Sequence, residues 1–471
     1  MGTQKVNKID SEMRAIFVRH LLNDIRALEI MLEKGMIESD IVRIGSEQEF
    51  CLVNNNWRPS KNALDILEAI DDSHFTTELA LYNLEINLDP VELKGDCFSK
   101  VENQLRSLLA KASAVSKKFG AKIVLAGILP TISKNELLLD FMTPSPRYRL
   151  LNEIVKQMRK NDLVLHIRGV DELSITHDSV LFEACNTSFQ THLQIAPDDF
   201  ISSYNWAQAI TGPILGVCAN SPLLLGRELW SETRIALFEQ SIDTRSSSYS
   251  LNDKEARVTF GNNWASGSIA DIFKDDIARF EVMFATDIEN NSLDELRKGN
   301  VPKLKALGLH NGTVYRWNRP CYGCSKDKAH IRIECRYLPA GPSVSDEMAN
   351  FALWVGLMMG RPKKFDDIPS RMDFREAKSN FIKSARTGSN SMMSWIDGHV
   401  PTRELVLREL LPIAYSGLEK ALVDKNDIER LLGIVEKRAK SMTGAQWNIR
   451  SYRNLKTVSY THLTLPTILR V

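Results

Sequence analysis

Apolar and polar residues alternate along several short stretches of the chain, and longer stretches with helical spacing separate them. In residues 82–90, apolar side chains at every second position face one way, whereas Glu85, Asn87 and Asp89 face the other way. Side chains on a strand point alternately to its two faces, so this stretch predicts a half-buried strand of an antiparallel sheet. Its polar face is unusually acidic.

Four further stretches are predicted as strands, at 42–53, 122–127, 189–195 and 331–337. Three of them carry polar or charged residues that share a face: Glu47 and Glu49, His192 and Gln194, and Arg332, Glu334 and Arg336. Like charges side by side on a sheet repel each other, so a positive partner is expected over the Glu47–Glu49 pair. Taken alone, this pair would also suit a solvent-facing edge strand.

Helical spacing predicts one helix before the first strand and others between the strands, at 11–34, 61–71, 97–119, 147–160 and 198–219. From residue 346 onward only helices are predicted, at 346–360, 371–386, 403–422 and 426–441. We therefore predict an α+β fold with an N-terminal helix (1–38), a core (39–345) and a helical C-terminal part of the same domain (346–457).

Residues 458–471 do not fit this pattern. The run from Ser459 to Thr467 follows a charged helical region without a turn signal, and it resembles translated sequencing-adapter read-through. We predict a non-native tail here, which would mean that the natural C-terminus is missing.

Composition narrows the function classes. The 471 residues carry 60 Lys and Arg against 59 Asp and Glu, a formal charge of +1, so no overall field attracts nucleic acid or a membrane surface. The seven Cys are scattered, which favours a reducing compartment, and no apolar run approaches about 18 residues. We expect a cytoplasmic protein that binds small-molecule substrates, with neither nucleic acid nor a membrane as partner. The sequence does not indicate an oligomeric state.

The polar faces of four predicted strands together offer carboxylates, one imidazole and guanidinium groups. Oxygen-rich ligands with a single His suit Mg²⁺ or Mn²⁺ better than Zn²⁺, and an Arg beside Glu334 suits a phosphate held against metal ions. The residues alone therefore predict metal-dependent phosphoryl transfer, with a purely structural, salt-bridged sheet as the open alternative. No glycine-rich phosphate loop is present in the sequence, which is consistent with a nucleotide held by a sheet and metals.

Six short motifs, in order along the chain, resemble those of the carboxylate–amine ligase and glutamate–cysteine ligase family. They are Gly45-Ser46-Glu47-Gln48-Glu49-Phe50, Glu78-Leu79 with Glu85, Pro146-Arg147-Tyr148-Arg149, Thr191-His192-Leu193-Gln194, Ala219-Asn220-Ser221-Pro222 and Glu334-Cys335-Arg336. Each motif is weak, but the ordered set is specific and covers residues 40–440. The resemblance implies the glutamine synthetase-like fold, in which a curved antiparallel sheet forms an active-site funnel backed by helices.

The resemblance also implies ATP-dependent ligation with Mg²⁺ or Mn²⁺. In this chemistry a substrate carboxylate attacks the γ-phosphate of ATP to give an acyl phosphate and ADP, and an amine then displaces phosphate to form an amide. Glutamate and cysteine, which would give γ-glutamylcysteine, are one candidate pair, but no motif identifies the amine.

Carried over residue by residue, the resemblance implies six metal ligands: Glu47, Glu49, Glu78, Glu85, His192 and Glu334. Arg336 would contact the transferring phosphate and act in catalysis together with Glu334. Gln194 and Arg319 are expected at the ATP, and Arg234 and Arg147 are candidates for holding a substrate carboxylate. The chain departs from the family pattern at Gln194, where many relatives have a second His, and at Asn83, where some have Gln.

Two other functions stay open at this stage: a catalytically silent nucleotide- or amino-acid-binding regulator, and a guanidino phosphotransferase. For single residues the plainer alternatives are an exposed helix-end acid at Glu78, a core histidine at His192, and surface helix residues at Arg147 and Arg234. Cys321 and Cys324 form one C-x-x-C pair without the further ligands of a zinc site, and we expect ordinary loop cysteines there.

Overall fold

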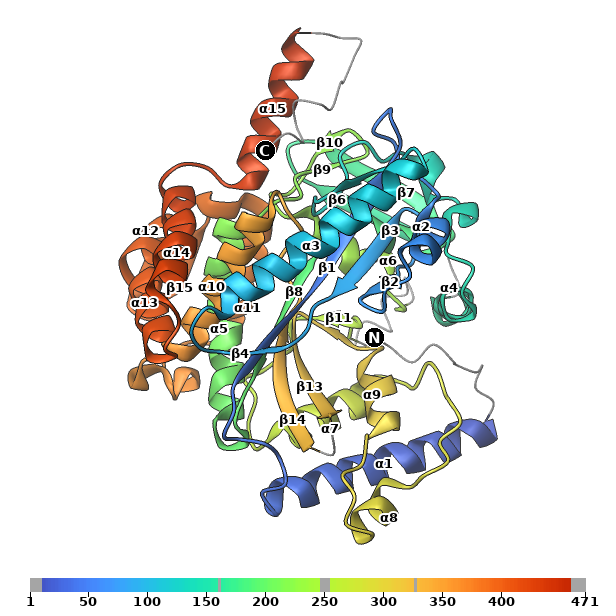
Figure 1. Cartoon of the computed structure of the whole chain (residues 1–471), viewed down its shortest axis with the longest axis vertical. Coiled ribbons are helices and arrows are strands. Elements are labelled where there is room, and N and C mark those ends of the chain that lie inside the picture. The colour runs from blue at the N-terminus through green and yellow to red at the C-terminus, as the bar shows by residue number, and fades with distance from the viewer. Residues whose placement is uncertain (1–10, 160–161, 246–254, 326–327, 459–471) are drawn as a thin grey trace.

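A single antiparallel sheet organises the chain in the computed structural model, which describes residues 11–159, 162–245, 255–325 and 328–458 (Figure 1). Its main path runs β13 (Asn318–Ser325), β14 (Lys328–Cys335), β8 (Phe189–Gln194), β1 (Arg43–Val53), β3 (Asn83–Asn87) and β2 (Phe75–Thr77). Two short strands, β4 (Val91–Glu92) and β5 (Lys122–Val124), also pair with β1. The α+β class predicted from the sequence is confirmed.

The register of the central strands brings the predicted polar positions into adjacent rows. Glu49 on β1 lies opposite Glu85 on β3, and Glu334 on β14 lies opposite His192 on β8. Glu47 lies opposite Gln190 on β8. Because directly opposite residues in an antiparallel pair point to the same face, these side chains gather on one side of the sheet.

The other side of β1 packs into the core. Its residues alternate strictly from Arg43 to Phe50, so that Ile44 and Phe50 are buried behind the sheet while Glu47 and Glu49 face the opposite way. Three long helices cover this back face or extend its core: α3 (Cys97–Lys118), α5 (Phe200–Cys218) and α10 (Val344–Met359). In Figure 1, α3 crosses the sheet in front of β1.

Phe351 on α10 marks the point where these layers meet. Its ring contacts Phe98 of α3 at 5.4 Å and Phe189 of β8 at 6.1 Å between ring centroids, both in edge-to-face geometry. Edge-to-face packing of aromatic rings adds to the stabilisation from burial. The sheet and two of its covering helices are therefore locked together at one residue.

The C-terminal helices extend this layer. α11 (Phe374–Thr387) packs on α5, and α13 (Leu411–Lys420) and α14 (Lys425–Lys440) pack on α10. The single helix predicted over 403–422 is interrupted: α12 (Thr402–Leu405) leads into a π-helical segment, Val406–Leu410, before α13 begins. Pro412 in the first turn of α13 is consistent with a new helix start there. The last described helix, α15 (Gly444–Val458), extends away from this layer (Figure 1).

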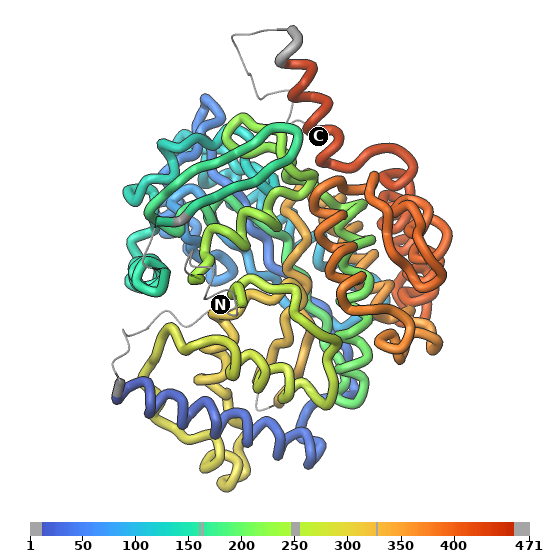
Figure 2. Tube along the Cα trace, turned by 180° about the vertical axis from the view of Figure 1, so that it is seen from behind, coloured from blue at the N-terminus to red at the C-terminus, as the bar shows by residue number. Residues whose placement is uncertain are grey.

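The N-terminal helix α1 (Ser11–Glu33) packs at the other end of the molecule, beside α7 (Ile269–Arg279), α8 (Ser292–Arg297) and α9 (Lys305–Asn311) (Figure 2). The buried carboxylate of Asp24 accepts hydrogen bonds from the Ser292 hydroxyl and, at 2.9 Å, from the Leu307 backbone N–H. One side chain of α1 thereby fixes the first turns of two other helices.

Several elements differ from the sequence-based prediction. Cys321 and Cys324 lie on strand β13 and not in a loop, because Pro320 and Gly323 are tolerated on this edge strand. The hairpin β6 (Leu163–Arg168) and β7 (Glu172–His177) and the helices α6 (Thr233–Ser241) to α9 were not predicted. Residues 459–471, where we expected a non-native tail, lie outside the described part of the chain.

The remaining elements are short. They comprise helices α2 (Ala63–Ile70) and α4 (Pro146–Arg159), the 3-10 segment η3 (Val180–Cys185), and the strand pairs β9–β10 (Leu223–Leu224, Arg227–Glu228), β11–β12 (Val258–Thr259, Tyr315–Arg316) and β15–β16 (Met392–Trp395, Gly398–Pro401). Among the described residues, no helix combines the length and the apolar character that crossing a membrane would require.

Truncation of Phe351, which joins α10 to α3 and to strand β8, should test this packing. We expect Phe351→Ala to lower the free energy of unfolding by about 3–5 kcal/mol, because it leaves a cavity between α3, α10 and β8. Urea unfolding followed by circular dichroism measures the loss. Ile16→Ala, at a side chain that is 49% exposed, should change stability by less than about 0.5 kcal/mol. Equal losses for the two variants would contradict the packing described here.

Candidate active site

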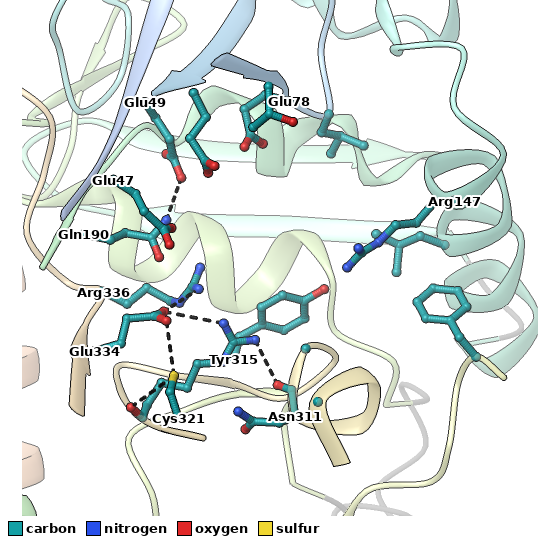
Figure 3. Close-up of a pocket in the computed structure, with 18 of the residues that line it drawn as sticks. Glu47, Glu49, Glu78, Arg147, Gln190, Asn311, Tyr315, Cys321, Glu334 and Arg336 are labelled. Carbon is teal, nitrogen blue, oxygen red and sulfur yellow. Dashed lines mark hydrogen bonds and ion pairs between the residues drawn. The ribbon is translucent and has the colours of Figure 1, made fainter. Parts of the chain in front are cut away.

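A cavity of about 380 Å³ opens on the polar side of the sheet (Figure 3). The strands β1, β3 and β14 contribute four carboxylates to it, Glu47, Glu49, Glu85 and Glu334, and Arg336 directly follows β14. Helices α4, α6, α7 and α9 also contribute lining residues. Arg147 of α4 lies across the cavity from Glu47 and Glu334, with the ring of Tyr315 between them (Figure 3).

Three carboxylates form a compact group at one end of the cavity. Oxygen atoms of Glu49, Glu78 and Glu85 all lie within 4.8 Å of one another. Glu78 directly follows β2, where the Thr143 hydroxyl donates a hydrogen bond to its backbone carbonyl at 2.6 Å. We call these three residues the carboxylate group. They are not exposed acids, because each is at least partly buried.

Hydrogen bonds orient the carboxylate group without neutralising it. Glu49 accepts from the Ser188 backbone N–H at 2.7 Å and from the Gln190 amide at 3.0 Å, and Glu85 accepts from Asn87 at 2.7 Å. Burial raises the pKa of Glu49, and burial together with neighbouring carboxylates raises the pKa values of Glu78 and Glu85. Part of the group therefore holds protons at neutral pH when no cation is bound.

A second group surrounds Glu334, in the row formed by β13, β14 and β8. His192 Nε2 lies 3.2 Å from Glu47 Oε1, and its Nδ1 lies 3.9 Å from Glu334 Oε2. Arg336 contacts Glu334 Oε1 at 2.5 Å, and Arg319 approaches the same oxygen at 3.5 Å. Unlike the carboxylate group, this cluster contains cations.

These cations lower the pKa values of the nearby acids. Burial acts to raise the pKa of Glu47, but the hydrogen bond and charge of His192 outweigh it, and the pKa is lowered. For Glu334, burial is likewise outweighed by the charges of Arg336 and Arg319. The cavity therefore has two electrostatic halves. One holds ionised, paired acids, and in the other the charges of Arg234 and Arg336 act on Glu49 but do not outweigh its burial.

Arg332 lies beside His192. Its Nε is 3.3 Å from His192 Nδ1, whereas His192 Nε2 lies beside Glu47. Arg332 lines the cavity although it was not among the predicted site residues. Its alternation with Glu334 along β14 is the sequence signal that indicated its face.

Three predicted site residues are not among those that line the cavity: His192, Gln194 and Arg234. Gln194 does not line it, because its amide is held between Arg43 and Glu38 by hydrogen bonds of 3.0 Å each. Arg234 is buried behind the cavity, where its guanidinium donates to Glu232 and to the Tyr337 carbonyl at 3.1 Å. Arg234 therefore supports the end of β14 and is not placed to bind a substrate carboxylate directly.

Sequence reasoning missed two further residues of the cavity. Glu183 lines it from the 3-10 segment η3, and burial and the charge of Glu49 raise its pKa to about 8. Cys321 lines it from β13, with its thiol 3.5 Å from Glu334 Oε2. Glu183 belongs to no periodic pattern or motif, and the C-x-x-C pair that contains Cys321 was interpreted as ordinary loop cysteines.

Comparisons with known proteins agree with this fold. A family model described as glutamate–cysteine ligase family 2 matches residues 43–454. Together, the family match and the fold define an ATP-dependent carbon–nitrogen ligase. The chain belongs to glutamate–cysteine ligase family 2, as the six motifs predicted. Among curated protein sequences, none matches the chain.

A solved structure shows the same fold at low sequence identity. The glutamate–cysteine ligase from Francisella tularensis, in complex with AMP, matches 92% of this chain and 92% of its own, with 12% identity and a TM-score of 0.50. A bifunctional glutathione synthetase from Pasteurella multocida matches 95% of this chain and 52% of its own, with 11% identity and a TM-score of 0.44. The first of these confirms the predicted fold class.

The raised pKa values predict how stability depends on pH. In the metal-free protein, the buried acids keep protons that the unfolded chain loses above its ordinary pKa of 4.5. Stability should therefore fall as the pH rises from about 5 to 8. In EDTA, Glu85→Gln should reduce this fall by about 1–2 kcal/mol between pH 6 and 8, because it removes one such acid. Thermal melts across this range measure the effect.

The matched control for this experiment is Glu68→Gln on α2, which removes an exposed carboxylate. It should leave the pH dependence unchanged. If Glu85→Gln and Glu68→Gln follow the same pH profile as the unmodified protein, the pKa of Glu85 is not raised.

Proposed function

We propose that this protein joins the carboxylate of one small molecule to the amine of another, with ATP as the energy source and an acyl phosphate as the intermediate. One observation carries the proposal: a single cavity holds the carboxylate group beside Arg336, which is paired with Glu334. Phosphoryl transfer requires positive groups around the transferring oxygens, and the cavity supplies them on one side. The name of the family suggests glutamate and cysteine as substrates.

The donor atoms of the cavity fit divalent metal ions. The carboxylate group has oxygens within 4.8 Å of one another and pKa values raised by burial. A hard cation such as Mg²⁺ or Mn²⁺ would compensate the negative charge of the ionised group. Glu49, Glu78 and Glu85 would hold one ion. Glu47, His192 and Glu334 would hold a second. Bound there, such ions would neutralise the phosphate oxygens of ATP and polarise the transferring phosphorus.

The chain's own cations would act on the γ-phosphate. Arg336 is held in place by Glu334, and Arg319 is fixed at 2.9 Å by the Asn311 carbonyl. Both guanidinium groups are anchored before substrate arrives, so little free energy is lost in orienting them. We propose Arg336 as the residue that contacts the transferring phosphoryl group and Arg319 as a second contact to ATP.

The proposed reaction has two steps. A substrate carboxylate oxygen bonds to the γ-phosphorus as the bond to the β,γ-bridging oxygen breaks, and ADP leaves with the electron pair. The amine nitrogen then bonds to the acyl carbon, the carbon–oxygen bond to phosphate breaks, and the nitrogen loses a proton. In sum, carboxylate, ammonium and ATP give amide, ADP, inorganic phosphate and one proton.

Arg147 is the remaining candidate for holding a substrate carboxylate. It is half-buried, it lines the cavity from α4, and it lies across the cavity from Glu334 (Figure 3). A guanidinium at this position would pair with a carboxylate that does not react and would keep it away from the negative carboxylate group.

A screen for ADP release tests the proposal. The protein is incubated with ATP, Mg²⁺, glutamate or another carboxylic acid, and a panel of amines, and ADP and inorganic phosphate are both measured. We expect equal amounts of ADP and phosphate with at least one amine. Glu47→Gln should abolish this release. ADP formation with a stable phosphorylated product in place of phosphate would indicate a phosphotransferase, and nucleotide binding without turnover would indicate a silent binding protein.

Arg336→Lys should lower kcat by about 100-fold or more, because a point charge replaces the planar guanidinium at the transferring phosphate. Arg316→Lys is the matched control. Arg316 is also buried and paired with a carboxylate, Asp276, but it does not line the cavity. It should lower the melting temperature without lowering kcat. Equal losses of kcat in the two variants would count against a direct role for Arg336.

A further inference from the structure

One of the six sequence motifs, Ala219-Asn220-Ser221-Pro222, has no part in the proposed reaction. None of its residues lines the cavity, and neither does Arg234, which follows it in the chain. Asn220, Ser221, Glu232 and Arg234 are nevertheless all buried. Burying two charged groups is costly unless they pair with each other and their remaining polar atoms find hydrogen bonds. The contacts of these residues therefore indicate what the motif does.

The turn formed by the motif holds the carboxylate of Glu232. The Asn220 backbone N–H donates to Glu232 Oε2 at 2.8 Å, and the Ser221 hydroxyl donates to Oε1 at 2.7 Å. Arg234 Nη1 donates to the same Oε1 at 3.1 Å. Both oxygens of this fully buried carboxylate are therefore engaged, and one of them holds the guanidinium of Arg234 by a charge-assisted hydrogen bond.

The guanidinium of Arg234 also contacts the chain directly after β14. Its Nη1 donates to the Tyr337 carbonyl at 3.1 Å, and its Nη2 lies 3.5 Å from the Arg336 carbonyl. The backbone N–H of Arg336 donates to the Trp317 carbonyl at 3.0 Å. The backbone of Arg336 is thus held from both sides, while its side chain lies beside Glu334 in the cavity (Figure 3).

Close packing leaves Arg234 little room for another conformation. Its side chain is almost completely buried. A Cβ added at Gly127 would lie 3.2 Å from Arg234 Cδ and 3.0 Å from Cβ atoms of Ser221 and Pro339. Because protein interiors are close-packed, such a side chain keeps one path and transmits its position to the groups that it contacts.

We propose that Arg234 is a positioning residue, which sets the place of the Arg336 guanidinium at the transferring phosphate by holding the carbonyls of residues 336 and 337. The turn at Asn220 and Ser221 acts one step further away, because it fixes Glu232 and, through it, Arg234. This inference rests on the proposed ligase function. It adds a residue that contacts neither ATP nor either of the molecules that are joined.

Replacing Arg234 by Lys tests the contact and retains the charge. Retaining the charge matters because burial raises the pKa of Glu49 and the charge of Arg234 acts in the opposite direction. An ammonium lacks the planar set of donors that reaches two neighbouring carbonyls and Glu232 together. Small misplacements of a group at the reacting atoms cost up to about 100-fold in rate. We expect Arg234→Lys to lower kcat about tenfold and to leave the KM values of ATP, the carboxylate and the amine within about twofold.

A double-mutant cycle with Arg336→Lys shows whether Arg234 acts through Arg336. In the Arg336→Lys background there is no guanidinium left to position, so adding Arg234→Lys should lower kcat by no more than about twofold. A residue that only stabilises the fold would lower kcat by the same factor in both backgrounds. Release of ADP and phosphate at saturating substrates gives kcat for all four proteins.

Arg438 on α14 provides the matched control. It is also buried, it pairs with Asp346 at 2.7 Å, and its guanidinium lies 3.4 Å from the carbonyls of Val217 and Asp346, but it does not line the cavity. Arg438→Lys should lower the melting temperature about as much as Arg234→Lys and leave kcat unchanged. If Arg234→Lys does not fold, Ser221→Ala removes only one hydrogen bond to Glu232, and it should lower kcat about threefold, again only when Arg336 is present.

The outcomes separate the inference from the function on which it rests. A raised KM of the carboxylate substrate with kcat retained would make Arg234 a substrate contact, which would overturn the inference and leave the ligase function intact. An equal loss of kcat in the two backgrounds, or no loss in either, would also overturn it. Absence of ADP release by the unmodified protein with every amine would overturn the proposed function, and the inference with it.

Discussion

Buried like charges on one face of the central strand are the constraint on which the rest of the structure depends. Because β1 alternates strictly, the same residues that bury Ile44 and Phe50 against helices also present Glu47 and Glu49 to the cavity. Removing carboxylates from water costs several kcal/mol each unless cations compensate for it. His192 and Arg336 provide that compensation at Glu47 and Glu334, but the carboxylate group has none of similar strength. The fold therefore keeps an unrelieved negative site, which is a common property of functional centres.

Much of this arrangement could be predicted from the sequence, because it follows from periodicity. The alternation at Glu47 and Glu49, at Glu85, and at Glu334 and Arg336 specifies which side chains share a face, and the sheet register then brings those faces together. The order of six motifs indicated the family and, with it, a curved antiparallel sheet that forms a funnel. Helix positions also followed from spacing, although the π-helical interruption at Val406–Leu410 did not.

The contacts of individual site residues could not be predicted, because periodicity specifies the face of a strand on which a side chain lies and not the residue that it contacts. Gln194 shares its face with His192, yet Glu38 and Arg43 at the end of the sheet hold its amide. Arg234 follows a family motif, but its side chain packs against Gly127, where an added Cβ would lie 3.2 Å from Arg234 Cδ, and its guanidinium is used by backbone carbonyls. Glu183 lies in a 3-10 segment without a repeating pattern, and the Pro and Gly residues around Cys321 are typical of a loop.

The charged residues of the cavity and the buried apolar side chains beside them also act on each other. Side chains such as Phe238 and Leu307 lower the local dielectric, which strengthens the pairing of Arg336 with Glu334 and increases the cost of the bare carboxylate group. They also offer water few partners, and in the proposed reaction this would protect an acyl phosphate from hydrolysis. The carboxylate of Asp24 on α1 accepts a hydrogen bond from the backbone N–H of Leu307, so the N-terminal helix supports α9 at this side of the cavity. These buried apolar side chains would therefore influence the electrostatics of phosphoryl transfer.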